Sequence, residues 1–143
     1  MTPKFLAAAL LIGASLGSSA AIAAESTSSP STFVGRVDPS AFHKVPLEYA
    51  KMGTTVDPAT VRQIVPGIDK FTIYRLIGTP HFGEGITRTW NYVLFFPTAL
   101  GSTERMRCRL EIRFKHLRGH YNVVVSDVIW QDQACADRVA SAS

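Results

Sequence analysis

Few residues of this chain have the types and spacings that catalysis or metal binding requires. His116 and His120 are four residues apart, a spacing that aligns two metal ligands only on a helix, but Gly119 lies between them in a segment expected to join two strands. His81 has no nucleophile or carboxylate placed beside it by any motif. The one G-x-S-x-G match, residues 13–17, lies in the apolar run at the N-terminus, and the sequence contains no H-E-x-x-H, phosphate-loop or dinucleotide pattern. We therefore predict a protein that is not an enzyme, with no metal site and no cofactor.

A surface that mixes apolar and cationic side chains is the main candidate for function. Alternate residues of a strand lie on one face of its sheet. On one face of two expected strands these residues are Asn91, Val93, Phe95, Arg107, Arg109 and Arg113. Such a face suits contact with a protein or with anionic lipid headgroups. The pattern also fits an ordinary solvated face, or a face covered by residues 41–53. We predict that these six residues form a partner-binding surface.

Alternation of apolar and polar residues predicts the strands that would carry this surface. It is clearest in residues 106–114, where apolar side chains alternate with charged ones. Residues 88–96 show a Trp-x-Tyr alternation, and residues 121–131 are rich in Val and Ile. A break near Ser126 indicates a bulge or an early end of the third strand. Loops containing Gly101 and Gly119 would join the three strands as antiparallel neighbours.

Two short helices are expected before these strands. Asp57 and Asp69 are each placed to cap the free N–H groups of a first turn, and Pro58 takes the first helical position. Gly78 and Pro80 end the second helix after residue 77. Helices followed by strands favour an α+β fold. We predict two short N-terminal helices packed on one face of a three-stranded antiparallel sheet.

The first 24 residues have the pattern of an export signal. Lys4 precedes an apolar run over residues 5–16, and Ala21-Ile22-Ala23 is a small-x-small cleavage sequence. The run is shorter than the ~20 apolar residues that span a bilayer. No Cys stands near the cleavage sequence to accept a lipid. We therefore expect a periplasmic protein, which would associate with the outer membrane through a partner.

The two cysteines, Cys108 and Cys135, are expected to form a disulfide. An exported protein with two cysteines tends to pair them. Cys135 follows the third expected strand, from where it could reach Cys108 on the helix-covered face of the sheet.

Composition divides the chain into one domain with extensions. We assign residues 1–24 to a signal peptide, 25–53 to a flexible or irregular leader, 54–136 to the domain and 137–143 to a flexible tail. The formal net charge of +4 comes from scattered basic residues, whereas a nucleic-acid-binding protein shows a dense basic stripe. Nucleic acid is therefore not an expected partner.

Together these elements resemble the SmpA/OmlA (BamE-like) domain family, and within it the domains that precede OmpA-like modules. The family joins a short helix, a second helix that ends in Gly-x-Pro, and a Trp-x-Tyr strand. The matching positions here are Gly67, Ile68, Asp69, Ile73, Ile77, Gly78, Pro80, Trp90 and Tyr92. The chain differs from the family's lipoproteins by lacking an N-terminal lipidated Cys, and at Asn91 and Phe95, where they have an aromatic and a basic residue.

This resemblance implies a non-enzymatic role in outer-membrane protein assembly or envelope integrity. The role would be carried out by binding an outer-membrane or periplasmic protein. The family's layout of two helices and three strands also resembles that of β-lactamase inhibitor proteins. A soluble inhibitor or immunity-type binding protein is therefore the alternative.

Overall fold

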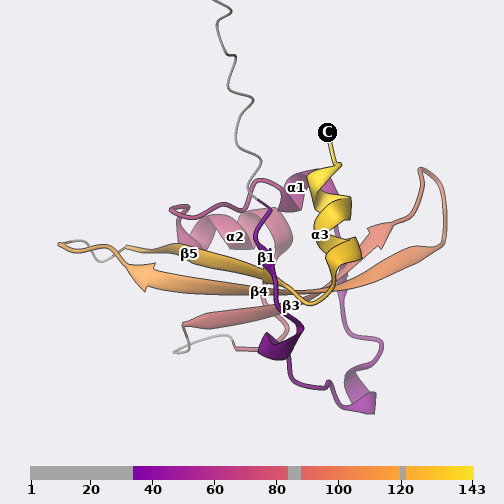
Figure 1. The fold of residues 1–143 in the computed structure, drawn as a ribbon, viewed down its shortest axis with the longest axis horizontal. Helices are drawn as coiled ribbons and strands as arrows, with labels where there is room; N and C mark the ends of the chain where they lie inside the picture. The colour runs from indigo at the N-terminus through magenta and orange to yellow at the C-terminus, as the bar shows by residue number, and fades with distance from the viewer. Residues whose placement is uncertain (1–33, 84–87, 120–121) are drawn as a thin grey trace, which may run out of the picture.

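A computed structural model of the chain describes residues 34–83, 88–119 and 122–143 (Figure 1). The expected signal peptide, residues 1–24, lies outside the described residues, and so does His120. In the described ranges, every helix is too short or too polar to cross a bilayer.

A five-stranded mixed sheet forms the centre of the fold. Its long strands are β3 (Thr89–Pro97), β4 (Arg105–His116) and β5 (Val123–Trp130), and they pair antiparallel as the alternation predicts. Two strands of two residues each, β1 (Arg36–Val37) and β2 (Thr54–Thr55), add parallel pairs to β5 and β3. The prediction of a three-stranded, wholly antiparallel sheet is therefore wrong in this respect. Two residues are too few to show an alternation, so β1 and β2 leave no signal in the sequence.

The irregularity expected in the third strand is a β-bulge. Phe114 pairs with Val125 and Arg113 pairs with Asp127, so that Ser126 has no opposite residue on β4. One extra residue shifts the alternation along the strand. As a result, Val125 and Val128 both face the same core although they are three positions apart.

The first two helices lie where the sequence predicts them. The carboxylate of Asp57 accepts a hydrogen bond from the Ala59 N–H at 2.9 Å and begins α1 (Pro58–Val61). Asp69 accepts from the Phe71 N–H at 2.8 Å and begins α2 (Lys70–Ile77). Gly78 ends α2 with a φ of 78°, a backbone conformation that glycine adopts without steric cost.

A third helix, α3 (Gln133–Ala140), was not predicted. Residues 137–140, which the sequence analysis assigned to a flexible tail, form its second half. The two predicted N-terminal helices are present, and the predicted layout is incomplete because this third helix follows the sheet. Cys135, Ala136 and Val139 of α3 are buried, so this short helix packs against the same sheet face as α1 and α2.

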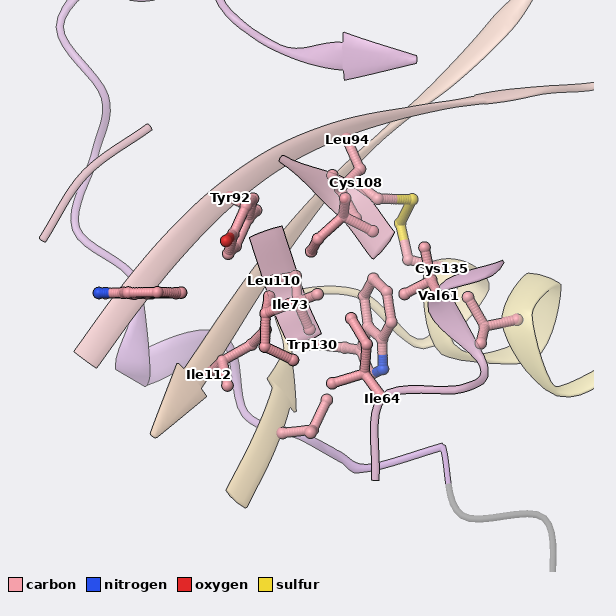
Figure 2. Close-up of a cluster of buried hydrophobic side chains, with 14 of the residues drawn as sticks. Val61, Ile64, Ile73, Tyr92, Leu94, Cys108, Leu110, Ile112, Trp130 and Cys135 are labelled. Atoms are coloured by element: carbon pink, nitrogen blue, oxygen red, sulfur yellow. A yellow bond between two sulfur atoms is a disulfide. The ribbon is translucent and has the colours of Figure 1, made fainter. Parts of the chain in front are cut away.

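The hydrophobic core lies between the three helices and the sheet. Figure 2 shows Val61 of α1 and Ile73 of α2 beside Tyr92, Leu110 and Trp130 of the strands, and all five side chains are at most 2% exposed. The Trp130 Nε1–H donates to the Val34 carbonyl at 2.6 Å. This bond fastens the residues before β1 to the core.

The predicted disulfide is confirmed. Cys108 of β4 and Cys135 of α3 are joined, with their Cα atoms 5.7 Å apart (Figure 2). Both residues are buried. The bond therefore anchors α3 to the middle strand of the sheet.

Short pieces of chain pair with both outer edges of the three long strands. On β5, β1 pairs with Ile129 and Trp130, and the Gly67–Ile68 backbone exchanges hydrogen bonds with Val125. On β3, β2 pairs with Leu94 and Phe95, and Phe82 exchanges hydrogen bonds with Asn91.

Candidate functional site

Residues 38–53 cross the sheet face opposite the helices, and we call them the cover. In Figure 1 the helices lie above the strands, and the 3-10 turns of the cover, Pro39–Ala41 and Leu47–Tyr49, lie below them. Gly53 ends the cover with a φ of 155°, where an added Cβ would come within 2.3 Å of the Phe95 ring. Of the three interpretations that the sequence left open, the structure has the one in which residues 41–53 cover the face.

The six residues predicted to bind a partner lie at different depths on this face. Val93 is fully buried and Arg109 is 7% exposed. Asn91, Phe95 and Arg113 are half-buried, whereas Arg107 is exposed. Val93 and Arg109 are opposite each other in the pairing of β3 with β4. Val93 and Arg109 are therefore buried between the sheet and the cover and are not part of the exposed surface.

Arg109 is held between the sheet and the cover. Its Nη1–H donates to the carbonyl of His43, and its guanidinium lies 5.1 Å from the centre of the Phe42 ring, which is a cation–π distance. Its Nε–H has no hydrogen-bond partner among the described residues. Burial, and secondarily the charge of Arg107, lower the pKa of Arg109, but an arginine stays protonated in a protein. Arg109 is therefore a buried cation whose Nε–H is not hydrogen-bonded by the described residues.

Glu111 is a second buried charge on this face that the sequence analysis did not select. It is 5% exposed, and its Oε1 accepts from Arg113 Nε at 2.7 Å. The alternation of residues 106–114 already placed Glu111 on the same face as the arginines. The signal was present, but the burial depends on the cover, which the alternation does not reveal.

Two cavities lie between the cover and the sheet. One, of about 350 Å³, is lined by Arg109 and Glu111 of β4, and the other, of about 310 Å³, by Arg107 and Arg109. Lys44 and Val45 of the cover line both cavities from the other side. Arg109 thus stands between the two cavities.

His81 and His116 do not belong to a metal-ligand cluster in the described part of the chain. His116 is exposed at the end of β4. No cluster of three His, Cys, Asp or Glu residues occurs in the ranges that the structure describes. His81 instead completes the edge of the sheet, because its Nδ1 accepts the Val93 N–H at 3.2 Å while its Nε2 faces the Thr54 hydroxyl at 3.4 Å.

This role of His81 predicts that stability falls in mild acid. Nδ1 can accept a hydrogen bond only in the neutral ring, and partial burial lowers the pKa of His81 from 6.5. The unfolded chain therefore binds the proton more readily, and the stabilisation is present above pH 6.5 and is lost as the pH falls through the lower folded pKa. Urea denaturation at a series of pH values should show this loss. His81→Asn, which keeps an acceptor but does not titrate, should flatten the slope.

The exposed His116 provides the control for this experiment. His116→Asn should leave the pH dependence of the parent protein unchanged. An equal flattening in both variants would contradict the role given to His81.

The fold and this face define a small, disulfide-linked α+β domain in which two helices precede an antiparallel meander of three strands. Residues 53–119 match the family model of the outer membrane protein assembly factor BamE domain. The match confirms the resemblance to this family that the sequence indicates. Comparisons with the curated proteins and with the solved structures gave no match.

The match covers only part of the fold. It includes β2, α1, α2, β3 and β4. Most of the cover, together with β1, β5 and α3, lies outside it. Residues beyond the family match thus contribute Cys135 of the disulfide and the cover wall of both cavities.

Proposed function

We propose that this protein is a non-enzymatic protein of the periplasm that supports outer-membrane protein assembly by binding another envelope protein. The observation that carries the proposal is the match of residues 53–119 to the BamE domain, a family of outer-membrane assembly factors. The export pattern of residues 1–24 supports the location.

The contact surface that we propose is the covered face together with the cover itself. Leu47 is 91% exposed on the cover, and the exposed Arg107 lies on β4 beneath it. Leu47 and Arg107 line the same cavity, so an apolar group and a cation are presented together. The half-buried Asn91, Phe95 and Arg113 extend the surface along the strands. Arginines beside apolar groups are characteristic of protein interfaces, and they would also attract anionic lipid headgroups.

Substitution of both Leu47 and Arg107 by Ser is expected to reduce recovery of the partner by roughly tenfold or more, because apolar and Arg anchors carry much of the energy of such interfaces. The measurement is co-purification of tagged protein from detergent-solubilised envelopes. A melting curve should show little change, since both side chains are exposed.

The helix side of the molecule offers a matched control. Phe71 is 70% exposed on α2, and Arg75 is exposed one turn further on. Phe71→Ser with Arg75→Ser removes the same kinds of group from the opposite side and should leave recovery intact. A larger loss from the control pair would place the interface on the helices. Recovery of a secreted or periplasmic enzyme in place of assembly components would favour the inhibitor alternative, and binding to anionic vesicles without a protein partner would favour lipid headgroups.

A further inference from the structure

The larger cavity beneath the cover has the size and the walls of a small-molecule site. Its volume of about 350 Å³ lies within the range of roughly 300–1,000 Å³ that is usual for such sites. One side is apolar, formed by Val45 and Pro46 of the cover and by Phe82. The sheet supplies polar groups, among them Asn91 and Arg109.

The charge on the sheet side of this cavity is only partly neutralised within the described structure, where the charge of Glu111 opposes the lowering of the Arg109 pKa. Arg109 is 7% exposed, and the ion pairs of the described residues do not include it. Glu111, the one carboxylate that lines the cavity, is paired with Arg113 at 2.7 Å. Lys44 adds a second cation from the cover. A buried charge with an unused donor is costly unless a counter-charge reaches it.

The groups that line the cavity select the kind of ligand. The Nη1 of Arg109 is engaged by the His43 carbonyl, and its Nε is a buried atom without a partner in the described part of the chain. The cavity is therefore offered the rest of this guanidinium together with the Lys44 ammonium, and such cations suit the two oxygens of a carboxylate. The apolar wall opposite favours a short hydrocarbon tail.

We propose that this cavity binds a small organic acid, with its carboxylate beside the cations Arg109 and Lys44 and its apolar tail against Val45, Pro46 and Phe82. This site goes beyond the proposed function, because it needs no envelope protein. Its test uses the purified protein alone, so its failure would leave the co-purification result untouched.

The test follows the Nε–H signals of arginine in an NMR titration of the isotope-labelled protein. Hexanoate is the probe, hexanol is its neutral match, and inorganic phosphate is an anion without a tail. The Arg109 signal is expected to shift saturably with millimolar hexanoate, and far less with the other two. No shift with hexanoate would overturn the proposal. An equal shift with hexanol would refute the role of the charge, and an equal shift with phosphate would refute the selection of a carboxylate.

Three variants locate the site. Arg109→Met should weaken the affinity for hexanoate by roughly tenfold or more, as expected for the loss of a charge-assisted hydrogen bond. Val45→Trp fills the cavity from the cover, outside the hydrogen-bonded strands, and should weaken binding even if Arg109→Met does not fold. Arg105→Met removes an exposed cation from the same strand, away from the cavity, and should bind as the parent does. Unchanged affinity in the Val45→Trp variant would place the ligand elsewhere.

Discussion

Reduction of the Cys108–Cys135 disulfide is expected to lower the free energy of unfolding by about 3 to 4 kcal/mol. The bond closes a loop across a sequence separation of 27, and opening this loop returns conformational freedom to the unfolded chain. For a domain of this size such a loss corresponds to a fall in melting temperature of roughly 10–20 °C. Calorimetry of the oxidised and reduced protein measures it directly.

The double variant Cys108→Ala, Cys135→Ala separates the cross-link from the packing of the sulfur atoms. Both residues are buried, so the variant should be less stable than the reduced parent, which keeps its core volume. Hydrogen exchange should rise first in α3, because the disulfide joins this helix to β4. A reduced protein that melts at the same temperature as the oxidised one would contradict the proposed contribution of the disulfide.

Replacement of Trp130 by Ala is expected to cost about 3–5 kcal/mol, the range for truncating a fully buried aromatic side chain. Trp130 has no exposed surface, and its ring packs 6.2 Å from that of Phe96, between centroids. Its Nε1–H also donates a hydrogen bond to the Val34 carbonyl, and its own carbonyl accepts one from the Asp38 N–H. Urea denaturation gives the loss, and residues 34–38 should become more accessible to hydrogen exchange.

A second buried tryptophan isolates the hydrogen bond from the packing. Trp90 is also fully buried, but its Nε1–H has no partner among the described residues. Trp130→Phe and Trp90→Phe remove similar volumes, and only the first leaves a carbonyl without its donor. Trp130→Phe should therefore be less stable than Trp90→Phe by about 1 kcal/mol. The reverse order would show that the Val34 contact contributes little.

The elements that the sequence predicts are those specified by neighbouring residues. The Asp57 and Asp69 caps, the Gly78 helix end and the alternation of β4 all act within a few positions, and each lies where it was predicted. α3 was missed because its buried face consists of only Cys135, Ala136 and Val139, which is too short and too small-sided a set to show a helical period, although Asp132 stands at its N-cap. Its position depends on the disulfide, a contact distant in sequence.

The candidate site could be predicted only in outline. Alternation correctly places Arg107 and Arg109 on one face, yet one is exposed and the other buried. The difference comes from the cover, whose residues Phe42 and His43 reach Arg109 from 66 or more positions away in the chain. Such contacts leave no local pattern, so neither the buried cation nor the cavities could be inferred from periodicity.

The short segments paired with both edges of the long strands affect how other extended chains can contact this protein. An open strand edge is a template on which any extended chain can add, and it leads to aggregation. Here β1 and the Gly67–Ile68 backbone occupy one edge, while β2, His81 and Phe82 occupy the other. A protein that supports outer-membrane protein assembly, as we propose, would meet chains whose strands are still unpaired. Because these short segments occupy the edges of β3 and β5, such chains could not add to those edges as extra strands.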